Sequence, residues 1–233
     1  ALEQQATATV HRYKERDLAE TSWAFAKLSI RSEPLVDAVL VATMPKLSTF
    51  PVRGLANIVQ ALATWRVHEE TVMVALSQSV KSKCHQFVGQ GLGNIAWAFA
   101  TLKHADDTLF EAIASASMRR ISELSLQNLS NIGWAFATVS VNRAEYVTRL
   151  FETIGKEVSI QGSLVEQEQS IANLVWAFAK VKVQSTPLMK LMASKIGEVP
   201  FTMQGLANVA WAFTELQSQD SMLRSLLQAA VQR

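Results

Sequence analysis

The feature that most constrains this chain is a segment that recurs along its whole length. Residues 92–102 read Leu-Gly-Asn-Ile-Ala-Trp-Ala-Phe-Ala-Thr-Leu, and residues 129–139 read Leu-Ser-Asn-Ile-Gly-Trp-Ala-Phe-Ala-Thr-Val. Further copies begin at Leu18, Leu55, Ile171 and Leu206. A regular period indicates an array in which each unit buries its apolar face only against its neighbours. We therefore expect one repeat domain over residues 1–233.

The period of the array is close to 37 residues. With the tryptophan of each copy as the reference, successive copies are 37, 37, 37, 42 and 35 residues apart. The reference positions are Trp23, Gln60, Trp97, Trp134, Trp176 and Trp211. Six units follow, at approximately 11–47, 48–85, 86–123, 124–161, 162–200 and 201–233. The long interval has room for an extra loop or helical turn around residues 161–166, and the short one trims a linker near Pro200.

Each copy predicts a helix, which we call helix A. It is rich in Ala, Leu and Phe, lacks Pro, and has its apolar residues at helical spacing. A second apolar stretch of helical period, helix B, follows each one, at roughly 33–43, 69–82, 106–119, 143–157, 186–197 and 219–232. Residues that favour a helix start stand at four of these beginnings: Ser32 with Pro34, Asp106, Asn142, and Thr186 with Pro187. The predicted fold is all-α, an α-solenoid of about six helix-turn-helix repeats.

The residues of helix A separate into faces when they are placed about 100° apart around its axis. The Leu five before the Trp, the Ile two before it, the Phe two after it and the Leu five after it share one face, which we expect to contact helix B. Small residues flank this face and allow neighbouring A helices to approach closely. The opposite face carries a mostly uncharged polar stripe, formed by the residues seven before, three before and four after the Trp.

This polar stripe is the candidate binding surface. In a two-helix solenoid the face of helix A turned away from helix B lines one, usually concave, surface, so the recurring Gln and Asn are expected to line a groove. The residues predicted to bind there are Arg53, Asn57, Thr64, Gln90, Asn94, Thr101, Gln127, Asn131, Thr138, Gln169, Asn173, Lys180, Gln204 and Asn208. The last copy ends its stripe with Glu215, and the first copy has Arg16, Glu20 and Lys27.

With its period near 37 and the pattern Leu-x-Asn-x-x-Trp-Ala-Phe-Ala, the chain resembles the octotricopeptide and heptatricopeptide repeat proteins of algal and protist organelles. The resemblance covers essentially all 233 residues. It is weaker in the first copy, where Glu20 replaces Asn, and in the second, where Gln60 and Leu62 replace Trp and Phe. It implies an α-solenoid of a mitochondrion or plastid that binds single-stranded or ribosomal RNA and acts in transcript processing, stability, translation or ribosome assembly.

The Asn and Trp columns each have two interpretations. An Asn amide can read a base edge, or it can satisfy loop and backbone groups between units. We favour the second, because a column that is Asn in five of six copies carries little sequence information. The Trp side chains can stack on bases, or fill the space between adjacent A helices with the indole N–H bonded nearby. We again favour the structural role, because the second copy loses Trp at Gln60 and gains it at Trp65.

A second hypothesis is a protein-interaction scaffold, a structural subunit of a larger organellar assembly such as a ribosome or membrane complex. The formal net charge of +2 permits a polyanionic partner without requiring one. Several basic residues on or near the B helices could contact phosphates, although interspersed acidic residues favour a solvated outer face. They are Lys81, Lys83, Arg119, Arg120, Arg143, Arg149, Lys190 and Lys195. The resemblance favours RNA, and the modest charge favours the scaffold.

Catalysis is not expected. Cys84 precedes His85 directly, which does not place a thiolate and a base in productive geometry. No metal-ligand spacing, phosphate-binding Gly loop or nuclease-like C-terminal domain is recognisable, so we predict no cofactor, metal or small-molecule substrate. Cys84 is the only cysteine, which fits a reducing compartment. No apolar run approaches the roughly 18 residues that span a bilayer. The N-terminus lacks an initiator Met and a signal-peptide core, as in a mature product or a piece of a longer protein.

Overall fold

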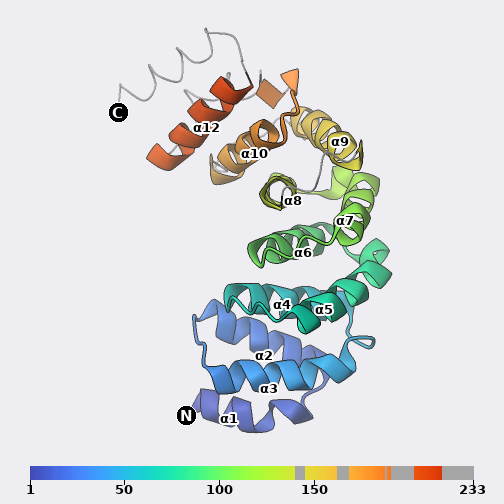
Figure 1. Cartoon of the computed structure of the whole chain (residues 1–233), viewed down its shortest axis with the longest axis vertical. Coiled ribbons are helices and arrows are strands. Elements are labelled where there is room, and N and C mark those ends of the chain that lie inside the picture. The colour runs from blue at the N-terminus through green and yellow to red at the C-terminus, as the bar shows by residue number, and fades with distance from the viewer. Residues whose placement is uncertain (140–144, 162–167, 187, 190–201, 217–233) are drawn as a thin grey trace. The chain divides into compact units, whose positions relative to one another are not determined.

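The computed structural model describes residues 1–139, 145–161, 168–186, 188–189 and 202–216. These residues form eleven α-helices and no strand, and the helices pack in neighbouring pairs as in an α-solenoid (Figure 1). The predicted fold class is confirmed. The chain divides into two compact units, residues 1–113 and 114–233. Within the described ranges, no helix combines the length and the apolar character needed to cross a membrane.

The first unit contains three A helices that pack side by side in sequence order. Helix α4 contacts α2 on one side and α6 on the other. The helices of this unit are α1 (Leu2–Thr9), α2 (Glu15–Lys27), α3 (Glu33–Thr43), α4 (Val52–Thr64), α5 (Glu70–Lys83), α6 (Gly89–Thr101) and the first part of α7 (Asp107–Arg119). Helices α3, α5 and α7 are the predicted B helices. Helix α1 packs on α3 and was not predicted, because its sequence has few apolar residues at helical spacing.

The second unit repeats this arrangement. Helix α10 packs between α8 and α12, and all three are predicted A helices. The described helices that lie wholly in this unit are α8 (Leu126–Thr138), α9 (Glu145–Gln161), α10 (Glu168–Val181) and α12 (Met203–Glu215). Helix α9 extends to Gln161, four residues beyond the predicted end of its B stretch. Several predicted features lie outside the described residues: Asn142, Arg143, residues 162–166, Pro187, Lys190, Lys195, Pro200, the B helix at 219–232 and most of the one at 186–197.

Side-chain caps begin the B helices where the sequence predicts them. Ser32 Oγ accepts a hydrogen bond from the Leu35 amide at 3.4 Å. Asp106 Oδ1 accepts one from the Leu109 amide at 3.1 Å. These bonds satisfy amides that have no partner inside the helix. In the fifth repeat the capping oxygen belongs to Ser185, one residue before the predicted Thr186.

The apolar face of helix A forms the core, as predicted. Phe99, Phe136, Phe178 and Phe213 occupy the same position in four copies, and each is at most 1% exposed. The ring of Phe178 lies edge-on to Phe151 of α9, with 4.9 Å between ring centroids. This aromatic contact joins helix B of the fourth repeat to helix A of the fifth.

Lysines at the end of α5 bond to other elements, both within their own repeat and in the next one. Lys83 Nζ donates to the main-chain oxygens of Ser48 and Phe50, at 2.7 and 2.6 Å. Lys81 Nζ lies 3.0 Å from Asp106 Oδ2. The expectation that Lys81 and Lys83 belong to a solvated outer face is therefore wrong. The sequence did not indicate these hydrogen bonds, because the accepting oxygens belong to residues more than twenty positions away.

Candidate functional site

The polar stripe lies on the exposed side of the A helices. Its outermost members are the residues seven before the Trp, which are exposed in the five copies where binding was predicted: Arg53, Gln90, Gln127, Gln169 and Gln204. They stand in or beside the first turn of α4, α6, α8, α10 and α12. Their exposed amide or guanidinium groups can meet a ligand on each unit, and Gln169 also bonds to Asn173.

The Asn column is half-buried rather than exposed. Asn57, Asn94, Asn131, Asn173 and Asn208 all have intermediate exposure. Asn94 Nδ2 lies 3.4 Å from Gln60 Oε1, on the neighbouring A helix of the first unit. Gln169 Nε2 donates to Asn173 Oδ1 at 2.9 Å on α10. These contacts are between side chains, so they differ from the backbone contacts that the structural interpretation expected.

The residues four after the Trp have two kinds of environment. Thr64, Thr138 and Lys180 are exposed. Thr64 Oγ1 donates to the Gln60 main-chain oxygen at 2.9 Å and is thus bonded within its own helix. Thr101 is half-buried, and its Oγ1 has no hydrogen-bond partner among the described residues. Because this oxygen is itself buried, Thr101 does not offer its hydroxyl to a ligand on the stripe.

The Trp column is only partly buried. Trp97, Trp134 and Trp176 are half-buried, and Trp23 and Trp211 are 39% and 41% exposed. The expectation that these indoles fill the space between A helices is correct only in part, because each keeps some surface beside the Asn column. Trp65, by contrast, is 2% exposed, and its Nε1 donates to the Ile30 main-chain oxygen at 2.9 Å. The predicted transfer of indole volume into the core of the second copy is confirmed.

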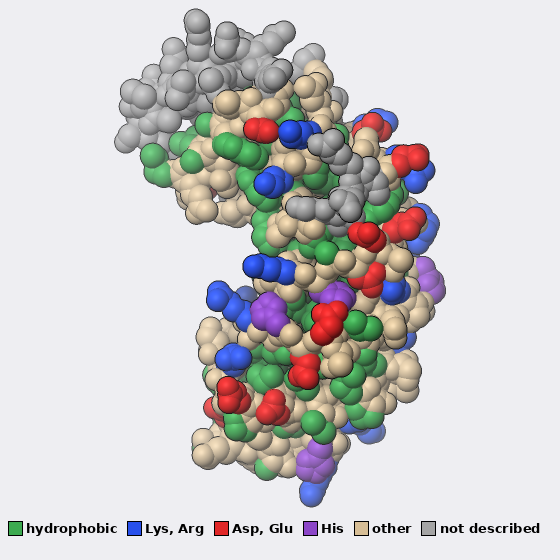
Figure 2. All heavy atoms as spheres, viewed as in Figure 1, with side chains coloured by type: hydrophobic (Ala, Val, Ile, Leu, Met, Phe, Trp, Pro, Cys, Tyr) green, Lys and Arg blue, Asp and Glu red, His purple; other side chains and the backbone are tan. Residues whose placement is uncertain are grey.

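In the first copy two stripe residues, Arg16 and Glu20, form an ion pair with each other. Arg16 Nε lies 3.0 Å from Glu20 Oε1, where the other copies place Gln or Arg against Asn. The hydrogen bond and the charge of Glu20 raise the pKa of the Arg16 guanidinium. On the face seen in Figure 2, Lys and Arg side chains alternate with Asp and Glu and do not merge into one basic patch. By its residue types the stripe is a surface made mostly of amides and hydroxyls.

Comparison with known families bears on what such a surface meets. A sequence profile described as RNA-editing substrate-binding complex 6 protein matches residues 1–145, more than half of the chain. The chain belongs to the RNA-editing substrate-binding complex 6 family. The match includes the stripe residues of the first four copies, Gln90 and Gln127 among them. No curated protein matches the chain. This match agrees with the sequence-based expectation of an RNA-associated helical family. Membership of the octotricopeptide or heptatricopeptide repeat proteins stays a prediction.

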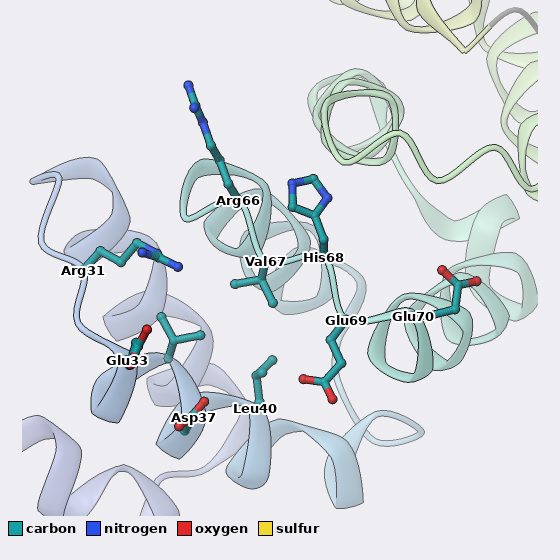
Figure 3. A pocket seen from close by; sticks show the side chains of 10 residues that line it. Arg31, Glu33, Asp37, Leu40, Arg66, Val67, His68, Glu69 and Glu70 are labelled. Carbon is teal, nitrogen blue, oxygen red and sulfur yellow. The ribbon is translucent and has the colours of Figure 1, made fainter.

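This member of the RNA-editing substrate-binding complex 6 family also has a surface hollow that sequence reasoning did not find. The hollow measures about 580 Å³ and is lined at the A-to-B loops of the first unit (Figure 3). Its floor carries the carboxylates of Glu33, Asp37 and Glu69. Arg66 and His68 stand at its rim. No local motif marks it, because its walls come from separate repeats.

Proposed function

We propose that this chain binds single-stranded RNA along the polar stripe, as a subunit of a complex that binds RNA-editing substrates. Its family name describes a complex of that kind. The observation that carries the proposal is the exposed Gln or Arg side chain at one position of successive A helices within each unit: Arg53 and Gln90 in the first unit, and Gln127, Gln169 and Gln204 in the second. A row of such groups at a regular interval suits an extended strand of nucleotides.

The two halves of the stripe have different roles in this proposal. Gln amides both donate and accept hydrogen bonds, so they match the edges of unpaired bases. In the fifth copy the half-buried Asn173 holds its reader, since it accepts a hydrogen bond from Gln169 at 2.9 Å. The partly exposed indoles beside them offer a flat apolar surface to the bases. In this proposal Asn packs on the A helix and also orients the Gln side chain that contacts the RNA.

The test is RNA binding by the purified chain over a salt series, measured by fluorescence anisotropy with a labelled single-stranded RNA. The variant Gln90→Ala/Gln127→Ala/Gln169→Ala/Gln204→Ala removes four readers without touching the core. We expect at least a tenfold weaker affinity, since each lost base contact is worth about 1 kcal/mol or more. Unchanged affinity in this variant, or wild-type binding no tighter than the non-specific range at low salt, contradicts the proposal.

A protein-interaction scaffold is the second candidate, and two exposed valines favour it. Val41 on α3 is 72% exposed and Val74 on α5 is 41% exposed, and both stand on B helices of the first unit. The repeat pattern does not require an apolar residue at either position. The variant Val41→Lys/Val74→Lys tests this role. Loss of a co-purifying partner after nuclease treatment, with RNA affinity retained, supports the scaffold.

We propose no catalytic step and no cofactor for this chain. Cys84 is buried and its neighbour His85 is exposed, so the two side chains have different surroundings. The mitochondrial or plastid location that the resemblance implied stays a prediction. Fractionation of cells that express the tagged full-length protein is the measurement that tests it.

A further inference from the structure

The C-terminal ends of the A helices share an unusual backbone conformation. Ser29, Arg66, Lys103 and Lys182 each stand six residues after the reference position and have φ angles between 56° and 59°. At each end the next residue's amide bonds back to a carbonyl five residues earlier, as Val67 does to Leu62 at 3.0 Å. This hydrogen-bonding pattern is a Schellman motif, which ends the helix at a residue in the left-handed conformation.

Glycine is the residue that adopts this conformation without steric cost. The chain has nine glycines, yet none of its six copies has Gly at this position. Three of the four described positions carry a basic side chain instead, and all four are exposed. A non-Gly residue in this conformation is strained, and the strain recurs at the same position of several repeats. Such recurrence indicates that the side chain has a functional role.

The basic side chains stand at the end of the polar stripe. Arg66 follows Thr64 by two residues, and Lys103 follows Thr101 by two. In Figure 3 Arg66 extends away from the carboxylates of Glu33 and Glu69 that line the hollow below it. Its guanidinium is therefore not neutralised by that acidic floor. Lys182 occupies the same register in the second unit, where its Nζ lies 3.9 Å from Glu215 Oε1.

We infer that Arg66, Lys103 and Lys182 bind phosphate groups of the RNA strand whose bases meet the polar stripe. This inference rests on the proposed function. The amides of the stripe are uncharged and supply no net charge to attract the phosphate backbone, whereas exposed cations at a constant register do. Such contacts are independent of base sequence, so they fix the strand without selecting it.

The test exploits the cost of the backbone conformation. Arg66→Gly/Lys103→Gly removes two cations and relieves two left-handed residues. We expect a Tm that is unchanged or a few degrees higher. RNA affinity should fall about tenfold at low salt, and the slope of log K against log salt should become shallower by about 1.4. Ser29→Gly is the matched control, because it relieves the same conformation without changing charge. Arg119→Gln/Lys156→Gln removes two cations from the B side and should leave RNA affinity unchanged.

The outcomes separate this inference from the proposed function. Wild-type protein that fails to bind single-stranded RNA overturns both. Wild-type binding with an unchanged affinity and salt slope in Arg66→Gly/Lys103→Gly overturns the phosphate contacts alone. An equal loss in the B-side control also overturns them, because the effect would then come from net charge. A weaker affinity together with a retained or raised Tm, in this variant only, supports the inference, since a merely structural role cannot produce both.

Discussion

Lys81 Nζ and Asp106 Oδ2 lie 3.0 Å apart and join α5 to the start of α7. Ser77 of α5 donates to the same carboxylate oxygen at 2.5 Å, and Thr108 donates to the other at 2.7 Å. Partial burial works to raise the pKa of Asp106, but these hydrogen bonds outweigh it and hold the pKa well below its usual range. One carboxylate therefore caps a B helix and ties it to the B helix of the preceding repeat.

Replacing Asp106 by Ala removes both the cap and the link between repeats. We expect a loss of about 2 kcal/mol in the free energy of unfolding, because a cap is worth about 1 kcal/mol and Ser77 loses its acceptor. For a chain of this size the Tm should fall by about 4–8 °C. Differential scanning calorimetry measures this change, and an unaltered Tm would refute the assigned role.

Acid should abolish the contribution of the Asp106 charge. The pKa of Asp106 is lower in the folded chain than in the unfolded chain, so its stabilisation is complete above the unfolded pKa of about 3.9 and is lost as pH falls toward the folded value. Asp106→Asn keeps the cap acceptor without the charge. Wild type should exceed this variant in stability by a constant margin from pH 7 to 5, and the margin should shrink below pH 4. A margin that grows in acid contradicts the prediction.

Trp65→Ala should be among the most damaging single changes in the first unit. The side chain is 2% exposed and its indole N–H is bonded to Ile30, so truncation leaves a large cavity and an unpaired carbonyl. A loss of about 3–5 kcal/mol is expected. Trp23→Ala is the control, because Trp23 is 39% exposed and should cost clearly less. Urea unfolding of both variants measures the difference, and similar costs would be inconsistent with the burial described.

Gly155→Ala should destabilise the second unit although Ala is the better helix former. A Cβ at position 155 would lie 2.5 Å from Ser185 Oγ and 3.1 Å from Ser185 Cβ. We expect a cost of about 1–3 kcal/mol from this overpacking. Gly155→Ala/Ser185→Ala removes the nearer atom and should recover part of it, so the double-mutant cycle should give a favourable coupling. Strictly additive losses would exclude the clash.

Glu20→Asn restores the repeat pattern in the first copy. The Arg16–Glu20 pair that it breaks is largely exposed, so the Tm should not change measurably. Arg16 is then free to meet RNA, and under the proposed function the affinity should rise severalfold at low salt. Glu20→Gln is the charge control, since it frees Arg16 without the Asn geometry. A drop in affinity for either variant argues against a stripe in the first copy.

Much of the fold follows from the periodic sequence. The apolar face that buries Phe99 and Phe136 repeats at a fixed register, and helical spacing alone assigns it to the core. Ser32 and Asp106 cap B helices as their chemistry predicts. Helix α1 was missed because it lacks that repeated signature and is held by packing on α3.

The candidate site was predicted less completely. The exposed Gln and Arg readers agree with the helical wheel, which depends only on spacing. The positive φ at Arg66 and Lys103 had no signal in the sequence, because the usual marker of that conformation is Gly. The hollow lined by Arg66 and Glu33 also had none, because residues far apart in the chain form it.

The sequence by itself determined the array, its period, and which face of each A helix is apolar and which is polar, because these depend on residue order along one helix. The tertiary structure decided how far each polar side chain is buried and what it contacts. Lys83 bonds to the Phe50 carbonyl at the start of its own repeat, and Trp65 bonds to Ile30 of the preceding repeat. Such partners are set by the stacking of units, and a contact between repeats leaves no mark on the residues next to it in the chain.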